Sequence, residues 1–222
     1  MAASNTPSYV LRYFDLAGRA ETTRLLLTAA NVEWTEEHPE WPAEKNNQPF
    51  GVLPVLVEKS TDGSPDFVIG QSGTIERYVA HRYGFLPTDL KEAALQEQFR
   101  DQTLDVGIAF YRFALSNEGK EDKKKVFVDT MEKFVRTLTD LLVKNGNNGH
   151  VFGDELSYAD AVSYGYHKHL LAEVTKLHAD ATEMIKSRLT PEIIKHLMAI
   201  EADPILAAHM SKTFSVTEIV QA

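Results

Sequence analysis

The first part of the chain alternates between short strand-like runs and a helical run. Three runs rich in apolar, β-branched and aromatic residues predict strands at 9–14, 32–35 and 54–58. The segment from Gly18 onward predicts a helix, because Leu25, Leu26 and Ala29 fall on one side of it. A strand, a helix and a second strand in this order predict a βαβ unit.

A hairpin and a second helix follow this unit. Residues 61–66 read TDGSPD, a dense turn signal, so 67–69 is expected to pair antiparallel with the third strand. A helix is then expected from Ser72, as its N-cap, to Gly84. Its apolar stripe comprises Ile75, Tyr78, Val79 and Tyr83. Residues 1–85 therefore predict an α/β domain of βαβ–ββα order.

The rest of the chain has helical periodicity only. After a predicted linker at 86–92, residues 93–222 predict an all-α domain, with helices that include 123–144, 158–171 and 191–202. The first long helix carries two apolar stripes on adjacent faces: Leu95, Phe99, Val106, Phe110 and Phe113, and Leu104, Ile108, Tyr111 and Leu115. Such a helix must be covered on two sides, by its own bundle and by another surface.

Composition and charge narrow the possible partners. With 43% hydrophobic and 25% charged residues, the chain has an ordinary globular balance, and its formal net charge of -9 argues against nucleic-acid binding. No apolar run approaches the roughly 18 residues of a membrane span, and the N-terminal MAASNTPS has no signal-peptide character. A cytoplasmic protein that binds neither nucleic acid nor membrane is expected.

The chain contains no cysteine. This excludes disulfides, thiolate metal ligands and a cysteine nucleophile, so any sulfur chemistry must use the sulfur of a ligand. His167 and His169 are two residues apart and diverge around a helix, so they are expected to be solvated or packed and to form no metal site.

Two segments carry a more specific pattern. Residues 13–21 read YFDLAGRAE, and residues 50–54 read FGVLP, with Gln71-Ser72 further on. In this order and spacing they resemble the cytosolic glutathione S-transferases of the tyrosine-using classes, particularly sigma, with pi, alpha and mu nearby. The SYAD element at 157–160 extends the resemblance into the helical half. The resemblance implies a thioredoxin-like N-terminal domain, a C-terminal helical bundle, glutathione as co-substrate and a role in detoxification.

Tyr13 lies where the first predicted strand ends, so its hydroxyl can point into a cleft. A phenol with a pKa of about 10 stays protonated and can donate a hydrogen bond to a thiolate. The resemblance gives Tyr13 this role toward the glutathione sulfur and implies that Arg19 supports the charge. The residues alone also fit an ordinary strand aromatic and a structural salt-bridge arginine.

The resemblance places glutathione against the backbone of Gly51, Val52, Leu53 and Pro54. In thioredoxin-like folds the proline before the third strand is cis, which would expose the backbone of Leu53 to pair with the cysteinyl part of glutathione. A trans proline at a strand start is the alternative. Val52 stands where many relatives have a polar or basic side chain, so one contact would be lost.

The two ends of glutathione are assigned to other residues by the same resemblance. The γ-glutamyl carboxylate would lie at Gln71 and Ser72, because a helix N-terminus offers free N–H groups to an anion; simple capping is the alternative. Trp41 and Lys45 would contact the glycyl carboxylate. Asp101 would reach across a dimer to the γ-glutamyl amine, with Asp105 as the competing choice.

The second substrate is expected to be a small hydrophobic electrophile. The resemblance places Phe14, Gly18 and Tyr111 along its site, although Tyr111 also fits a core position. The second stripe of the long helix, with Asp101, predicts a two-fold homodimer. Two further functions stay open: a non-catalytic protein that binds glutathione or hydrophobic ligands, and a glutathione-dependent isomerase such as a prostaglandin synthase.

Overall fold

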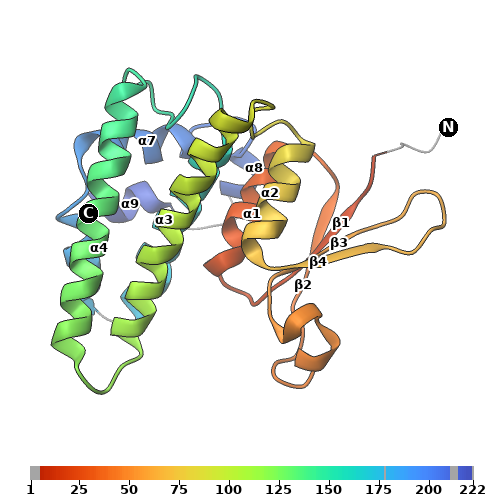
Figure 1. Cartoon of the computed structure of the whole chain (residues 1–222), viewed down its shortest axis with the longest axis horizontal. Helices are drawn as coiled ribbons and strands as arrows, with labels where there is room; N and C mark the ends of the chain where they lie inside the picture. Colours follow the sequence, from red (N-terminus) through yellow and green to blue (C-terminus); the bar gives the residue numbers. More distant parts are fainter. Residues whose placement is uncertain (1–5, 178, 211–214, 222) are drawn as a thin grey trace.

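The computed structural model describes residues 6–177, 179–210 and 215–221, and it contains a small mixed sheet beside a larger helical part (Figure 1). The sheet has the order β2-β1-β3-β4, with β1 (Tyr9–Arg12), β2 (Trp34–Glu37), β3 (Val55–Glu58) and β4 (Phe67–Gly70). β1 is parallel to β2 and antiparallel to β3, and β3 is antiparallel to β4. The predicted thioredoxin-like domain of βαβ–ββα order is confirmed.

The helices of this domain are α1 (Glu21–Ala29), which continues the 3₁₀ helix η1 (Gly18–Ala20), and α2 (Ser72–Arg82). Two more 3₁₀ helices, η2 (Lys45–Asn47) and η3 (Pro49–Gly51), lie between β2 and β3. The second strand begins two residues later than expected, because Asn31 takes a left-handed conformation (φ 51°) that ends the preceding helix.

The helical part comprises α3 (Leu90–Ala114), α4 (Lys120–Lys144), α5 (Tyr158–Leu177), α6 (Ala179–Lys186), α7 (Pro191–Glu201), α8 (Ala207–Met210) and α9 (Val216–Gln221). α3 begins at Leu90 because the Asp89 carboxylate accepts hydrogen bonds from the N–H groups of Lys91 and Glu92. α7 begins at Pro191, as expected, because the Thr190 side chain caps it by accepting a hydrogen bond from the N–H of Ile193. The sequence pattern did not predict α6, α8 or α9.

The two parts pack through α1 and α2, which stand between the sheet and the helical part (Figure 1). α1 approaches α5 closely at Gly165, where a Cβ atom would lie 2.9 Å from Oγ1 of Thr22. Glycine is therefore required there for the two domains to meet.

A buried group of charges ties this contact together. The carboxylate of Glu21, on α1, accepts hydrogen bonds from Lys168 of α5 (2.5 Å) and Arg24 of its own helix (3.0 Å), and it contacts His209 of α8 at 2.8 Å. The side chains of Glu21 and Lys168 are each only 2% exposed. Since a buried carboxylate needs compensation, the three cationic or polar partners hold the domains in one arrangement.

Two buried histidines of α5 make the stability of the fold depend on pH. Burial lowers the pKa of His167 to about 4, and burial together with the charge of Arg19 lowers the pKa of His169 to about 4. Because the unfolded chain takes up protons near pH 6.5 and the folded chain does not, unfolding becomes easier as the pH falls from 6.5 to 4, by about 1 kcal/mol per histidine per pH unit.

We therefore expect the urea midpoint to fall between pH 7 and pH 5, and to fall less steeply in His167→Asn. A midpoint that is equal or higher at pH 5 would contradict this account of α5.

Candidate active site

The strand register brings three predicted site segments to one end of the sheet. Arg12 is paired with Val55, and Val55 with Gly70. The residues that follow or precede these positions, Tyr13, Pro54 and Gln71, therefore leave the sheet side by side. The peptide bond between Leu53 and Pro54 is cis, as the thioredoxin-like pattern implied.

Tyr13 lies directly after β1, with its side chain only 6% exposed. Its phenolic oxygen accepts a hydrogen bond from the backbone N–H of Arg19, at 3.0 Å. Gly18 passes so close that a Cβ there would lie 2.5 Å from the phenolic oxygen, and its φ of +45° is one that other residues rarely adopt. The chain between β1 and α1 is thus shaped around the tyrosine hydroxyl.

Gly18→Ala tests this packing. We expect it to lower the rate of a reaction at the Tyr13 hydroxyl by at least about tenfold, since the added carbon must displace the phenol and a misplacement near 1 Å can cost about 10²-fold. Gly107→Ala is the matched control, because Gly107 lines the same cavity and an added Cβ meets nothing within 4 Å. Equal effects of the two variants on that rate would contradict this packing.

The segment between β2 and β3 carries further predicted site residues, and two of them, Trp41 and Lys45, each lie against another predicted site residue. The ring of Trp41 meets the ring of Phe14 edge-on, with centroids 5.6 Å apart, and Phe14 in turn contacts Tyr13. Lys45 lies over Gly51, where a Cβ would be 3.6 Å from Cε of the lysine. Both Trp41 and Val52 remain 37% exposed, so this surface is open to a ligand.

The expected N-cap of α2 is wrong. Gln71 occupies the cap position with φ 71°, and its side chain makes no capping hydrogen bond; Ser72 is the first helical residue. The Ser72 hydroxyl oxygen instead accepts a hydrogen bond from Nη2 of Arg100, at 3.1 Å. The Ser72 side chain therefore does not cap α2. A helix leaves its first N–H groups without an intrahelical partner, so an anion can accept hydrogen bonds from them.

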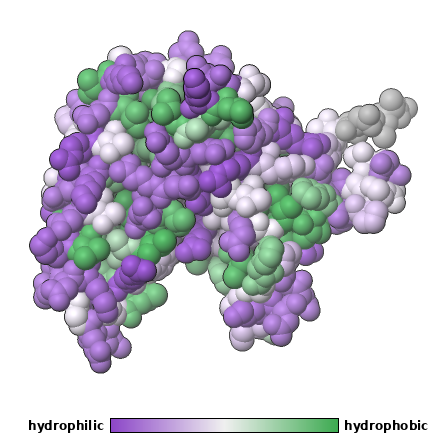
Figure 2. Space-filling view, viewed as in Figure 1, coloured by the Kyte–Doolittle hydropathy of each residue, from purple (hydrophilic) through white to green (hydrophobic). Residues whose placement is uncertain are grey.

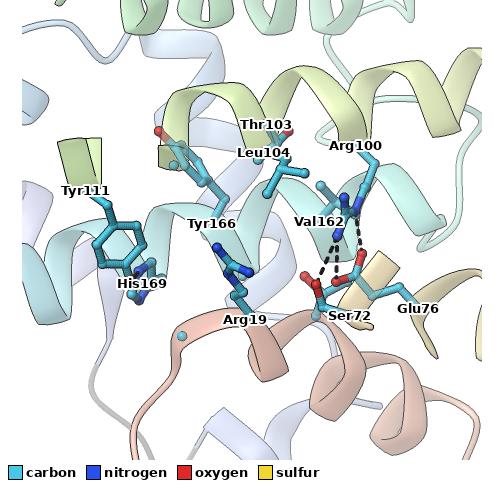
Figure 3. Close-up of a pocket in the computed structure, with 14 residues that line it drawn as sticks. Arg19, Ser72, Glu76, Arg100, Thr103, Leu104, Tyr111, Val162, Tyr166 and His169 are labelled. Atoms are coloured by element: carbon cyan, nitrogen blue, oxygen red, sulfur yellow. Dashed lines mark hydrogen bonds and ion pairs between the residues drawn. The ribbon is translucent and has the colours of Figure 1, made fainter. Parts of the chain in front are cut away.

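A cavity of about 80 Å³ lies between the two domains (Figure 3). Gly18, Arg19 and Ser72 line it from the first domain, and Tyr111 lines it from α3. The Tyr111 hydroxyl forms a hydrogen bond of 2.7 Å with Nε2 of His169, and the side chain of Arg19 points toward them (Figure 3). His169 is thus packed, one of the two states expected for it.

Arg100 and Glu76 are site residues that the sequence reasoning missed. Both are buried and line the cavity, and Nε of Arg100 donates to Glu76 at 2.8 Å. Burial lowers the pKa of the Arg100 guanidinium, but the Glu76 carboxylate outweighs it, so the net pKa is raised. In the sequence, Arg100 directly follows Phe99, which belongs to the first apolar stripe. An arginine in such a position is a candidate for burial, and a buried arginine requires a partner.

Asp101 lies apart from this cavity. Its side chain is 60% exposed and pairs with Arg77 of α2 at 3.3 Å. Asp105 is also exposed. Within the described residues no group of three His, Asp or Glu side chains could hold a metal ion. None of the described helices combines the length and apolarity needed to cross a membrane.

Comparison with known proteins identifies the family. Residues 9–81 match the family model "Glutathione S-transferase, N-terminal domain", and residues 91–213 match "Glutathione S-transferase, C-terminal domain". This chain belongs to the glutathione S-transferase family. The expectation of a glutathione transferase with glutathione as co-substrate is confirmed at the level of this family.

Individual transferases and a related synthase agree with this assignment. The probable glutathione S-transferase 6 of Caenorhabditis elegans is 35% identical over 161 residues, covering 68% of this chain and 75% of that protein. Hematopoietic prostaglandin D synthase of Gallus gallus is 33% identical over 158 residues, covering 69% and 75%. The structure of monomeric Na-GST-3, from the hookworm Necator americanus, is 30% identical, with a TM-score of 0.72 over 93% of this chain and 98% of that one.

Proposed function

We propose that this transferase joins the sulfur of glutathione to a small hydrophobic electrophile, with the Tyr13 hydroxyl stabilising the thiolate. The observation that carries the proposal is the hydrogen bond from the N–H of Arg19, a residue that lines the interdomain cavity, to the Tyr13 oxygen. A donor to the phenolic oxygen polarises the O–H bond, which strengthens the hydrogen bond that the phenol can give to a sulfur anion.

Glutathione would extend from the start of α2 to η2. In this pose the γ-glutamyl carboxylate binds at Gln71 and Ser72, and the backbone of Leu53, directly before Pro54, pairs with the cysteinyl part. Gly51 and Val52 form the adjoining wall. Trp41 and Lys45 complete the pose by binding the glycyl carboxylate. Asp101 binds the γ-glutamyl amine across a dimer.

The chemistry is a nucleophilic substitution or addition by sulfur. With a chloronitrobenzene, the sulfur–carbon bond forms, the carbon–chlorine bond breaks, chloride leaves with the electron pair, and the thiol proton goes to water. Phe14, Gly18 and Tyr111 form the electrophile side of the site, and the guanidinium of Arg19 adds positive charge beside the sulfur. The Phe14–Tyr13 ring contact at 5.3 Å places an apolar surface next to the hydroxyl.

Thiolate formation accounts for only part of the expected acceleration. A thiol with a pKa of about 8.5 is a few per cent ionised at pH 7, and lowering the pKa by about two units raises the thiolate fraction roughly 25-fold. The lower pKa also makes the thiolate a weaker nucleophile, which cancels a factor of roughly eight from that gain. Orientation of the electrophile beside the sulfur must supply much of the remaining rate.

The direct test is conjugation of glutathione with a chloronitrobenzene by the purified protein. We expect saturable turnover and stoichiometric loss of both substrates. Binding of glutathione without turnover of any electrophile would favour the non-catalytic alternative, and absence of glutathione binding would contradict the proposal.

A glutathione-dependent isomerase is the second candidate, because the 33%-identical relative from Gallus gallus is a prostaglandin D synthase. An isomerase returns its glutathione unchanged. Measurement of glutathione before and after turnover of a prostaglandin endoperoxide therefore separates the two functions: consumption supports the transferase, and an unchanged amount with isomerised product supports the synthase.

We also propose a cytoplasmic detoxification role, with residues 1–85 and 93–222 as the two domains and 86–92 as the linker.

We further propose that the protein is a two-fold homodimer. Apolar surface covers the N-terminal domain near β4 (Figure 2), and the exposed apolar residues of this domain include Phe50, Phe67 and Val68. Such side chains commonly mark interfaces. Sedimentation of a single species with twice the chain mass at micromolar concentration is expected; a monomer, the state described for the hookworm transferase Na-GST-3, would contradict the dimer.

A further inference from the structure

Arg100 crosses from the helical domain to the start of α2. Figure 3 shows its guanidinium between Ser72 and Glu76, with contacts to both. Glu76 is held in turn by the hydroxyl of Tyr158, which donates to its carboxylate at 3.1 Å. Since Arg100 and Glu76 are only 8% and 4% exposed, the guanidinium has little freedom to move.

The contact with Arg100 fixes the direction of the Ser72 hydroxyl. A serine hydroxyl has one hydrogen to donate and two lone pairs to accept with, whereas a guanidinium only donates. The 3.1 Å contact with Nη2 of Arg100 therefore uses a lone pair of Ser72, and the hydroxyl hydrogen must point elsewhere. Ser72 is left as a hydrogen-bond donor, which is the role that an anion beside it requires.

The neighbouring glycine provides the room for this arrangement. A Cβ at Gly73 would lie 2.9 Å from Cζ and 3.0 Å from Nη2 of Arg100. Any other residue would push the guanidinium away from the start of α2. Ser72, Gly73 and Glu76 thus all fit the position of Arg100, although they belong to the other domain.

We propose that Arg100 is a positioning residue for glutathione, which holds Ser72 as a donor to the γ-glutamyl carboxylate. This inference rests on the proposed glutathione site. Arg100 acts through Ser72 and adds positive charge behind it, while Glu76 keeps the guanidinium in place. The helical domain thereby contributes to the affinity of the first domain for glutathione.

A double-mutant cycle tests the proposal. Glu76→Gln/Arg100→Gln removes both buried charges together, so that no unpaired charge is left to unfold the protein. We expect it to raise the Kd for glutathione about tenfold, as for loss of one charge-assisted hydrogen bond. When Ser72→Ala is already present, adding Glu76→Gln and Arg100→Gln should raise the Kd for glutathione by no more than about twofold. Arg100→Lys, which keeps a cationic donor, should recover part of the affinity.

A glutathione analogue that lacks the γ-glutamyl α-carboxylate provides a second readout. Its Kd should change by no more than about twofold in Glu76→Gln/Arg100→Gln, since the group that Ser72 serves is absent. If the ion pair were purely structural, its removal would weaken the binding of glutathione and of the analogue by the same factor, with or without Ser72. Either of those results, or an unchanged Kd for glutathione, would overturn the role of Arg100 alone. A wild-type protein that does not bind glutathione would overturn the proposed function as well.

Discussion

Tyr13→Phe is expected to lower kcat/KM for conjugation about 10- to 100-fold at pH 7. Loss of one hydrogen bond to a charged group costs about 1.5–3 kcal/mol, and each 1.4 kcal/mol is a factor of about ten in rate. The phenyl ring keeps the contact with Phe14, so packing should be preserved. Steady-state kinetics with glutathione and a chloronitrobenzene measure the effect.

Tyr9→Phe is the matched control for this variant. Tyr9 lies on β1, the strand that Tyr13 follows, and it is also a buried residue, but its hydroxyl forms a hydrogen bond of 2.6 Å with the hydroxyl of Tyr83. Its loss should affect stability and leave kcat/KM within about twofold of the wild type. Equal losses of activity in the two variants would show that the Tyr13 hydroxyl has no special role.

Glu21→Gln is expected to destabilise the protein by about 3–5 kcal/mol, as for the removal of one partner from a buried ion pair. The side chains of Glu21 and Lys168 are each only 2% exposed, so water cannot replace the lost ion pair. For a chain of this size the change corresponds to a fall of about 6–20 °C in Tm, measured by circular dichroism. The loss should be accompanied by easier separation of the two domains, since Glu21 and Lys168 belong to different ones.

Glu36→Gln is the control for the buried pair. Glu36 binds Arg24, which also contacts Glu21, but its side chain is 22% exposed and water can replace the lost contact. A cost of about 1 kcal/mol or less is expected. A Tm change of the same size in both variants would contradict the claim that burial makes Glu21 important.

The contribution of Glu21 also has a pH signature. Burial alone would raise its pKa, but the hydrogen bond with His209 and the charges of Lys168 and Arg24 lower it. A lowered carboxylate pKa stabilises the fold above the unfolded value of about 4.3, and that stability is lost as the pH falls below it. This window begins near pH 4.3 and extends downward, so it follows on from the range of pH 6.5 to 4 in which His167 and His169 act.

The sequence predicts most of what depends on local pattern. Alternating strands and helices gave the order of the first domain. The first strand was expected to run to residue 14, but β1 ends at Arg12, so Tyr13 lies directly after it in the glycine-containing turn. Thr190 and Pro191 mark the start of α7 by chemistry that needs no distant partner. Boundaries shifted where one backbone conformation decides them, as at Asn31.

What the sequence did not predict depends on contacts between distant segments. Ser72 has the composition of an N-cap, yet Gln71 takes that position and Ser72 accepts from Arg100, 28 residues away. The pairing of Arg100 with Glu76 across the domain boundary leaves no local trace beyond a charge next to Phe99, a residue of an apolar stripe. Short helices such as α8 and α9 lack enough turns to show a period, since four and six residues cover fewer than two turns.

Titration of bound glutathione by its ultraviolet thiolate absorbance would show whether Tyr13 stabilises a glutathione thiolate. In the wild type, the pKa of the bound thiol should lie well below that of free glutathione, and in Tyr13→Phe it should return toward the free value. Bound glutathione with the same thiol pKa in both proteins would contradict the role of Tyr13, and Arg19 would then be the next residue to test.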